Sequence, residues 1–327
     1  MQLKRVKTLA VLCALVFVII VCFGCSSEDS GVNDGSQGQG CNCSVTFFDM
    51  GTSESVLLRF NDGKTMLVDC GGVEDANALK TALQRVNVQT IDYLVLTHPD
   101  VDHVGGAETV INDFNVGTLF IPKILGALSN LFPTYKSAVE LAKSKGVQTE
   151  ISDTDDCFTG EDYQIVFLAP QVVGGSYADF NSTFNPNETQ VDNLSSVIYI
   201  NIMGIRFLLT GDAGYAVEDE IISNYTSGLY GVASEEFGGE VNLEDIEFLK
   251  VAKGGRDGGT SSSLLSILRP KNAIVFTGDG ASPSNLVLTR LYNANNDYNL
   301  YRTDVYGNIT INILGSGQYG IGSDKSA

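Results

Sequence analysis

One short loop constrains the fold and the chemistry of this chain more than any other part of its sequence. The almost entirely apolar stretch 91–96 predicts a buried strand. The residues that follow are Thr97-His98-Pro99-Asp100-Val101-Asp102-His103-Val104-Gly105-Gly106. Alternation in an extended segment points His98 and Asp100 the same way, and a turn brings Asp102 and His103 close to them. The alternative is a solvated acidic loop, but both histidines of the chain fall here, which favours a metal site.

Strands and helices alternate along the rest of the chain in two comparable halves. We expect strands at 45–48, 55–60, 64–69 and 91–96 and an amphipathic helix at 77–86 in the first half. In the second half we expect strands at 196–202, 206–209, 246–252 and 272–276. This pattern predicts an α/β fold in which two sheets pack face to face with helices outside.

The ligand-rich loop resembles the His-x-His-x-Asp-His signature of the metallo-β-lactamase superfamily, in the form that ComEC-like competence proteins carry. Further matches follow in the family's order along residues 44–315, and they are Asp49-Met50-Gly51, Glu54-Ser55, Leu67-Val68-Asp69-Cys70-Gly71, Asn193-Leu194-Ser195-Ser196-Val197, Phe207-Leu208-Leu209-Thr210-Gly211-Asp212 and Tyr301-Arg302-Thr303-Asp304. The resemblance implies an αββα sandwich with a metal site at one edge of its two sheets. It also implies that Asp212 takes the place of a bridging aspartate.

The chain departs from this family at several of the metal ligands. Asp100 stands where the family has its second signature histidine, and Lys253-Gly254-Gly255-Arg256 stands where it has His-His-Gly-Ser. Ser282 replaces another family histidine. The remaining candidate ligands are His98, Asp100, Asp102, His103 and Asp212. Such a set predicts one divalent ion, Zn²⁺, Mn²⁺ or Fe²⁺. A second ion of the kind usual in this family lacks the histidine that the family supplies later in the sequence.

Lys253 has two interpretations at the sequence level. In the first interpretation, the ammonium group of Lys253 replaces a missing metal cation and pairs with Asp102 or Asp212, because buried carboxylates without a compensating positive charge are costly. Alternatively, the side chain of Lys253 points into solvent.

Two functions from different classes follow from these observations. The first is a metal-dependent hydrolase of a phosphodiester or another small molecule, in which Asp100 and Asp102 act with the ion, Asp100 as a ligand or a base. Lys253 then stabilises the negative charge that develops during the reaction. The second is a catalytically inactive surface protein that keeps the fold as a binding scaffold.

The N-terminus predicts export. Basic residues precede an apolar run at 9–23, and the small residue before Cys25 resembles a bacterial lipoprotein signal, with an uncleaved anchor helix as the alternative. We therefore expect a signal peptide at 1–25 lipidated on Cys25, a flexible polar tether at 26–42, the folded domain at 43–315 and a C-terminal tail at 316–327. The expected location is the bacterial cell surface, with the membrane as partner.

The net charge and the cysteine content lead to two further expectations. The net charge of −19 disfavours non-specific binding to nucleic acids, which are polyanions. Beyond Cys25, four cysteines allow two disulfides in three pairings, and they are Cys41, Cys43, Cys70 and Cys157. In the alternative interpretation, Cys70 and Cys157 are small buried hydrophobic residues.

Overall fold

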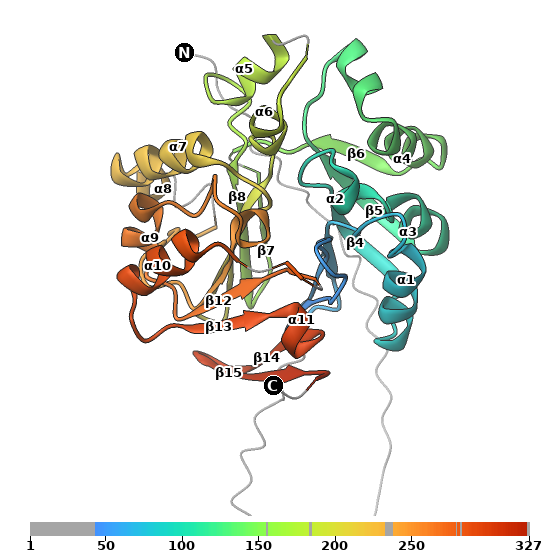
Figure 1. Cartoon of the computed structure of the whole chain (residues 1–327). Helices are drawn as coiled ribbons and strands as arrows, with labels where there is room; N and C mark the ends of the chain where they lie inside the picture. The colour runs from blue at the N-terminus through green and yellow to red at the C-terminus, as the bar shows by residue number, and fades with distance from the viewer. Residues whose placement is uncertain are drawn as a thin grey trace, which may run out of the picture. The chain divides into compact units, whose positions relative to one another are not determined.

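Two β-sheets form the centre of the folded domain, and helices cover their outer faces (Figure 1). The computed structural model describes residues 43–154, 156–182, 185–232, 238–278, 280–281 and 283–325. The expected signal peptide with Cys25, the tether with Cys41, and Ser282 lie outside these residues. Within the described ranges, every helix is too short or too polar to span a lipid bilayer.

The first sheet combines strands from both ends of the described chain. Its strands, in spatial order, are β15 (Gln318–Ser323), β14 (Ile309–Gly315), β1 (Ser44–Phe47), β2 (Val56–Arg59), β3 (Thr65–Val68), β4 (Thr90–Val95), β5 (Asn115–Ile121) and β6 (Gln148–Ile151). β3 to β6 run parallel to one another, whereas the other neighbours are antiparallel. Because β15 pairs with β14, the sheet continues past residue 315 into the segment that we expected to be a C-terminal tail.

The second sheet comes from the later part of the chain. Its strands, in spatial order, are β13 (Asn299–Arg302), β12 (Asn272–Val275), β11 (Phe248–Lys250), β10 (Ile205–Leu209), β9 (Val197–Ile202), β8 (Tyr163–Ala169) and β7 (Cys157–Thr159). β10 to β13 run parallel, whereas β7 to β10 pair antiparallel.

Helices pack on the outer face of each sheet, so the layers are αββα (Figure 1). The helices on the first sheet are α1 (Ala76–Arg85), α2 (Val101–Val104), α3 (Ala107–Asp113) and α4 (Pro133–Ser144). Those on the second sheet are α7 (Tyr215–Thr226), α8 (Leu229–Val232), α9 (Ser262–Leu268) and α10 (Asn285–Ala294). The short elements between them are η1 (Gly126–Leu131), α5 (Tyr177–Ser182), α6 (Glu188–Asp192), η2 (Ala252–Gly255) and α11 (Thr303–Tyr306).

The central strands are apolar on both faces because each face meets a different layer. In β9, Ile198 and Ile200 pack into the cluster between the two sheets, whereas Tyr199 packs under the helices of the second sheet. Side chains alternate across a strand, so a continuous apolar run fills both interfaces at once. This confirms the predicted face-to-face packing of two sheets with helices outside.

Most of the predicted elements are confirmed within one or two residues. The turn at 61–63 joins β2 to β3, with Gly63 at a φ of 84°. β11 is shorter than predicted, because η2 begins at Ala252 and the chain turns sharply where Lys253 has a φ of 57°. Cys70 is fully buried in the apolar cluster under α1, as a small hydrophobic side chain would be.

Phe207 tests how strongly the interface between the sheets stabilises the domain. Its ring is fully buried there and stacks on Phe248, with ring centroids 4.9 Å apart. We expect Phe207→Ala to lower the free energy of unfolding by about 3–5 kcal/mol, because it leaves a cavity. Tyr292→Ala, at a side chain that is 59% exposed, should change it by less than about 0.5 kcal/mol. Urea unfolding of the full chain measures both; equal losses would contradict this packing.

Candidate metal centre

The candidate ligands lie where the carboxyl ends of parallel strands from the two sheets meet. β4 runs parallel to β3 and leads into Thr97 and His98, whereas β10 runs parallel to β11 and leads into Asp212. Residues 195–196, just before β9, connect these two loops: the backbone N–H of Ser196 donates to the Thr97 carbonyl at 3.1 Å, and the backbone N–H of Asp212 donates to the Ser195 hydroxyl at 2.9 Å. Side chains that follow parallel strands gather at one sheet edge, which explains why distant parts of the chain supply this site.

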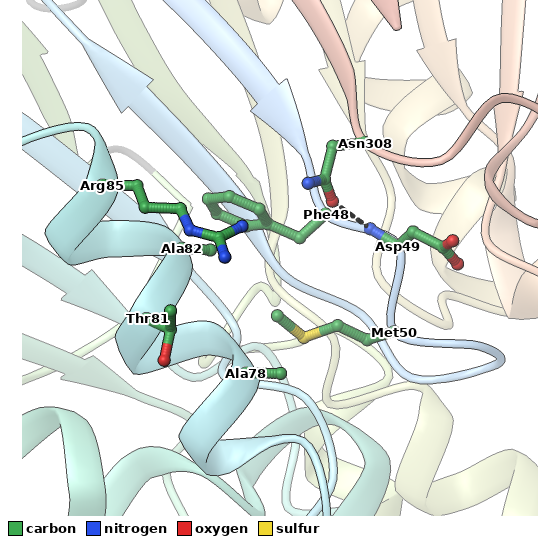
Figure 2. Close-up of a pocket in the computed structure, with 8 residues that line it drawn as sticks. All are labelled: Phe48, Asp49, Met50, Ala78, Thr81, Ala82, Arg85 and Asn308. Atoms are coloured by element: carbon green, nitrogen blue, oxygen red, sulfur yellow. Dashed lines mark hydrogen bonds between the residues drawn. The ribbon is translucent and has the colours of Figure 1, made fainter. Parts of the chain in front are cut away.

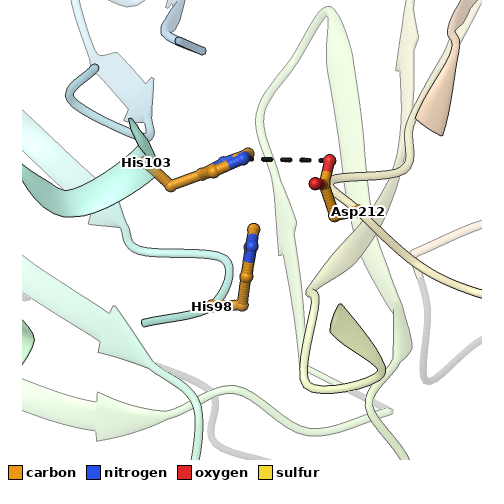
Figure 3. A group of neighbouring side chains, drawn as sticks. All are labelled: His98, His103 and Asp212. Atoms are coloured by element: carbon orange, nitrogen blue, oxygen red, sulfur yellow. Dashed lines mark ion pairs between the residues drawn. The ribbon is translucent and has the colours of Figure 1, made fainter. Parts of the chain in front are cut away.

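His98, His103 and Asp212 form the central group of metal-capable side chains (Figure 3). All three side chains are buried, and one ligand atom from each lies within 4.8 Å of the others. Nε2 of His103 lies 3.8 Å from Oδ1 of Asp212. These are three of the five ligands that the sequence predicted, and the structure brings them together.

The protonation of His98 follows from its hydrogen bonds. The Thr97 hydroxyl donates its only proton to Asp69 at 2.7 Å, so at 3.1 Å it accepts from Nδ1–H of His98. Burial lowers the pKa of His98 well below its ordinary value, and the imidazole is therefore neutral. Its Nε2 then carries a free lone pair, is buried and has no hydrogen-bond partner in the described structure. A divalent ion fits such an atom, and so the residues present fit a metal.

Asp69 orients His103 so that the Nε2 atom of His103 faces Asp212. Its carboxylate accepts a hydrogen bond from Nδ1 of His103 at 2.7 Å, which leaves Nε2 directed toward Asp212 (Figure 3). Burial alone lowers the pKa of His103, but the charges of Asp69 and Glu54 outweigh it and raise the pKa to about 10. The sequence reasoning missed Asp69 as a site residue, although its place at the end of the strand beside β4 was a usable signal.

Asp212 lies among positive groups. Its carboxylate accepts the backbone N–H of Lys253 at 3.0 Å, and Nζ of Lys250 and a guanidinium nitrogen of Arg256 lie 3.9 Å and 3.6 Å away. Burial by itself raises the pKa of Asp212, but the charges of His103 and Lys250 hold it well below its usual range. Asp212 is therefore ionised and available as a ligand.

A second group consists of His98, Asp100 and Asp192. Oδ2 of Asp100 lies 3.7 Å from Nε2 of His98. Burial, with the negative charges of Asp102 and Asp192, raises the pKa of Asp100 to about 6. The sequence reasoning missed Asp192, the last residue of the short helix α6, because no pattern in that helix distinguishes it.

Lys253 is buried, so the prediction that it points into solvent is wrong. Its ammonium group pairs with the carboxylate of Asp192, and not with Asp102 or Asp212 as expected. The backbone N–H of Lys253 binds Asp212, whereas its side chain reaches Asp192 on α6. Burial raises the pKa of Asp192, and the hydrogen bond from Lys253 opposes this rise.

Lys250 supplies a second buried positive charge that the sequence reasoning missed. Its ammonium group pairs with Glu54 and donates to the carbonyl of Gly211 at 2.7 Å. Burial raises the pKa of Glu54 to about 7, against the opposing charges of Lys250 and His103. Glu54, Asp69 and His103 form the third metal-capable group. A lysine inside an apolar strand such as β11 was the available signal, because lysine is seldom buried without a partner.

Asp102 plays a different part from the one expected. It lies on α2, is only partly buried, and belongs to none of the three metal-capable groups among the described residues. Its backbone carbonyl accepts the N–H of Glu54 at 3.1 Å. The structure therefore places Asp102 as a support for Glu54, and does not bring its carboxylate to His98 and His103.

A separate pocket lies beside α1 (Figure 2). The residues that line it are Phe48, Asp49, Met50, Ala78, Thr81, Ala82, Arg85 and Asn308. The side-chain oxygen of Asn308 accepts the backbone N–H of Asp49 at 2.7 Å. None of the candidate metal ligands lines this pocket, and it is not the metal centre.

Comparisons with known proteins identify the family of this chain. The family model of the metallo-beta-lactamase superfamily matches residues 49–279. "ComE operon protein 3" of Bacillus subtilis is 27% identical over 191 residues, which is 58% of this chain and 20% of that protein. "Anti-Pycsar protein Apyc1" of Bacillus phage BSP38 is 32% identical over 84 residues, 22% of this chain and 30% of that protein. The matches thus span less than a third of either relative.

Among solved structures, the metallo-beta-lactamase fold protein YhfI from Bacillus subtilis is 12% identical, with a TM-score of 0.47. The likeness covers 86% of this chain and 100% of YhfI. The family match covers most of the folded domain, including β4, the ligand-rich loop and Asp212. The chain therefore belongs to the metallo-beta-lactamase superfamily.

Proposed function

We propose that this chain is a metal-dependent hydrolase that holds one divalent ion between His98, His103 and Asp212. The observation that carries the proposal is the buried Nε2 of His98, which lacks a hydrogen-bond partner in the described structure. Two imidazole nitrogens and one carboxylate suit Zn²⁺, Mn²⁺ or Fe²⁺, and binding of the ion would release the Nε2 proton that His103 carries while its pKa is about 10. When bound, such an ion supplies Lewis acidity and makes a water molecule more acidic.

We assign the substrate class as a small phosphodiester. Arg256 supports this choice, because its side chain is 63% exposed and its guanidinium lies 3.6 Å from the buried Asp212. A guanidinium binds phosphate oxygens in a bidentate manner. The net charge of −19 repels long polyanions and so favours a small substrate over nucleic acid.

The roles of the remaining residues follow from their positions. Asp100 has a 37% exposed side chain next to His98, so it is placed to accept a proton from water entering the site. The sequence analysis gave Lys253 the role of stabilising developing negative charge. Because the ammonium of Lys253 pairs with Asp192, we assign that role to Arg256 instead.

One observation favours the inactive-scaffold function as a second candidate. Lys250 pairs with Glu54, and Lys253 pairs with Asp192, so two buried carboxylates are neutralised without any metal ion. A site of this kind can be stable as a purely structural arrangement. The metal content of the protein separates the two candidates.

The metal content of the full chain, purified without chelator, is the first test of the hydrolase proposal. We expect about one ion per chain by plasma mass spectrometry, and loss of the ion in His98→Ala and Asp212→Ala because each removes a ligand. Asp297→Ala, at an exposed position, should keep the ion. If the parent protein takes up no Zn²⁺, Mn²⁺ or Fe²⁺, the hydrolase proposal is wrong and the scaffold function is favoured.

Arg256→Ala tests the choice of an anionic substrate. We expect kcat/KM for bis(p-nitrophenyl) phosphate to fall about 10- to 100-fold, mainly through KM, because a charged hydrogen bond to phosphate is lost. The metal content should not change. Arg269→Ala is the matched control, because Arg269 pairs with Asp245. An Arg256→Ala enzyme with parental kinetics would rule out phosphate binding by this side chain.

We further propose that the chain is exported and anchored by a lipid on Cys25. The support is the order of basic residues, apolar run and cysteine at the N-terminus. In a bacterial host, the parent chain should incorporate a palmitate analogue and sediment with membranes, whereas Cys25→Ser should lose the label. Cys22→Ser serves as the matched control and should keep it. Equal labelling of the parent and the Cys25→Ser variant would contradict the lipid anchor.

A further inference from the structure

The two metal-capable groups that share His98 differ in their charge. In the first group, the partners of His98 are His103 and Asp212, and in the second they are Asp100 and Asp192. The ammonium of Lys253 forms its hydrogen bond with Asp192, in the second group. One of the two groups therefore already contains a cation that the chain itself supplies.

The burial of Lys253 and Asp192 makes each dependent on the other. Lys253 is 6% exposed and Asp192 is 2% exposed. A buried ammonium group needs a negative partner, and a buried carboxylate needs a positive one. If the ammonium is removed, the charge of Asp192 can be compensated by another cation, provided that further ligands are near.

Further ligands are near. Oδ2 of Asp100 lies 3.7 Å from Nε2 of His98, and this nitrogen is fully buried without a hydrogen-bond partner in the described structure. Asp100 is also partly exposed, so one ligand of this group is in contact with solvent. Two carboxylates and one imidazole form a ligand set that suits Mn²⁺, which accepts oxygen ligands readily.

We propose that the ammonium of Lys253 occupies a cation site formed by Asp192, Asp100 and His98, and that it thereby keeps a divalent ion away from Asp192. This inference rests on the proposed function only in that both groups use His98. The single lone pair on Nε2 serves one ion at a time. Removal of the Lys253 ammonium therefore lets the ion at His98 gain the carboxylate of Asp192 as a ligand, and it removes the repulsion between the ion and the ammonium. It does not create a second full site.

The test is the affinity of the chelator-treated full chain for Mn²⁺, measured by calorimetric titration. We expect Lys253→Met to lower the Kd at least about tenfold, because the affinity of an ion site rises with the number of its charged ligands. Lys253→Arg keeps the positive charge and should bind like the parent. The double variant Lys253→Met with Asp192→Asn should return to about the parental Kd, because the added ligand is gone.

Several outcomes would overturn the inference. If the Kd of Lys253→Met for Mn²⁺ is unchanged or higher than that of the parent, the ammonium does not compete with the ion. A gain that persists in the double variant shows that Asp192 is not involved. If the parent takes up none of Zn²⁺, Mn²⁺ and Fe²⁺, the proposed function fails, yet Asp192-dependent binding of Mn²⁺ in Lys253→Met still supports this inference, and its absence there overturns it.

A second neutral variant keeps the inference testable if Lys253→Met does not fold. Lys253→Gln carries no charge but retains an amide that can donate to Asp192, and the same gain in affinity is expected. The thermal unfolding midpoint gives an independent readout. Added Mn²⁺ should raise the midpoint of either neutral variant more than that of the parent, because the ion replaces the missing positive charge. An equal rise in parent and variant would contradict the inference.

Discussion

The carboxylate of Asp69 determines the geometry of the whole centre. It accepts the backbone N–H of Thr97 at 2.8 Å, the hydroxyl of Thr97 at 2.7 Å and Nδ1–H of His103 at 2.7 Å. Through Thr97 it also sets the tautomer of His98. Asp69 itself has a φ of 61°, an unusual conformation for a residue other than glycine, and such strain is typical of functional sites.

Because Asp69 directs both imidazoles, their Nε2 atoms face the side chain that the other sheet supplies. Asp212 comes from the end of β10. Residues 195–196 connect its loop to the loop after β4, because the backbone N–H of Asp212 donates to the Ser195 hydroxyl and the backbone N–H of Ser196 donates to the Thr97 carbonyl. The first sheet thus contributes two of the three ligands, and the second sheet contributes Asp212. The apolar cluster between the sheets holds the two contributions in place, so packing far from the site controls its geometry.

The sequence predicted the layers and the central ligands because both depend on local patterns. The apolar run of β9 and the spacing of His98 and His103 are visible within a few residues. Asp69, Glu54, Lys250 and Asp192 were missed as site residues because each is a single side chain whose partner lies far away in the chain. Their pairing depends on which strand ends meet, and no local pattern states this. The error over Lys253 has the same origin, because its partner lies on α6.

The buried charges of this centre are paired within the protein, so its stability does not depend on a bound metal ion. Lys250 and Lys253 lie in hydrogen-bonding contact with Glu54 and Asp192, so these carboxylates are compensated in the metal-free protein. Of the side-chain atoms of His98, His103 and Asp212 in the described structure, the one that is buried without a hydrogen-bond partner is Nε2 of His98, which is neutral and costs less to leave unpaired than a charge does. A fold whose charges are already paired does not require an ion to form, unlike a small zinc domain that unfolds without its metal. In this protein an ion at His98, His103 and Asp212 would therefore contribute chemistry more than it contributes to folding.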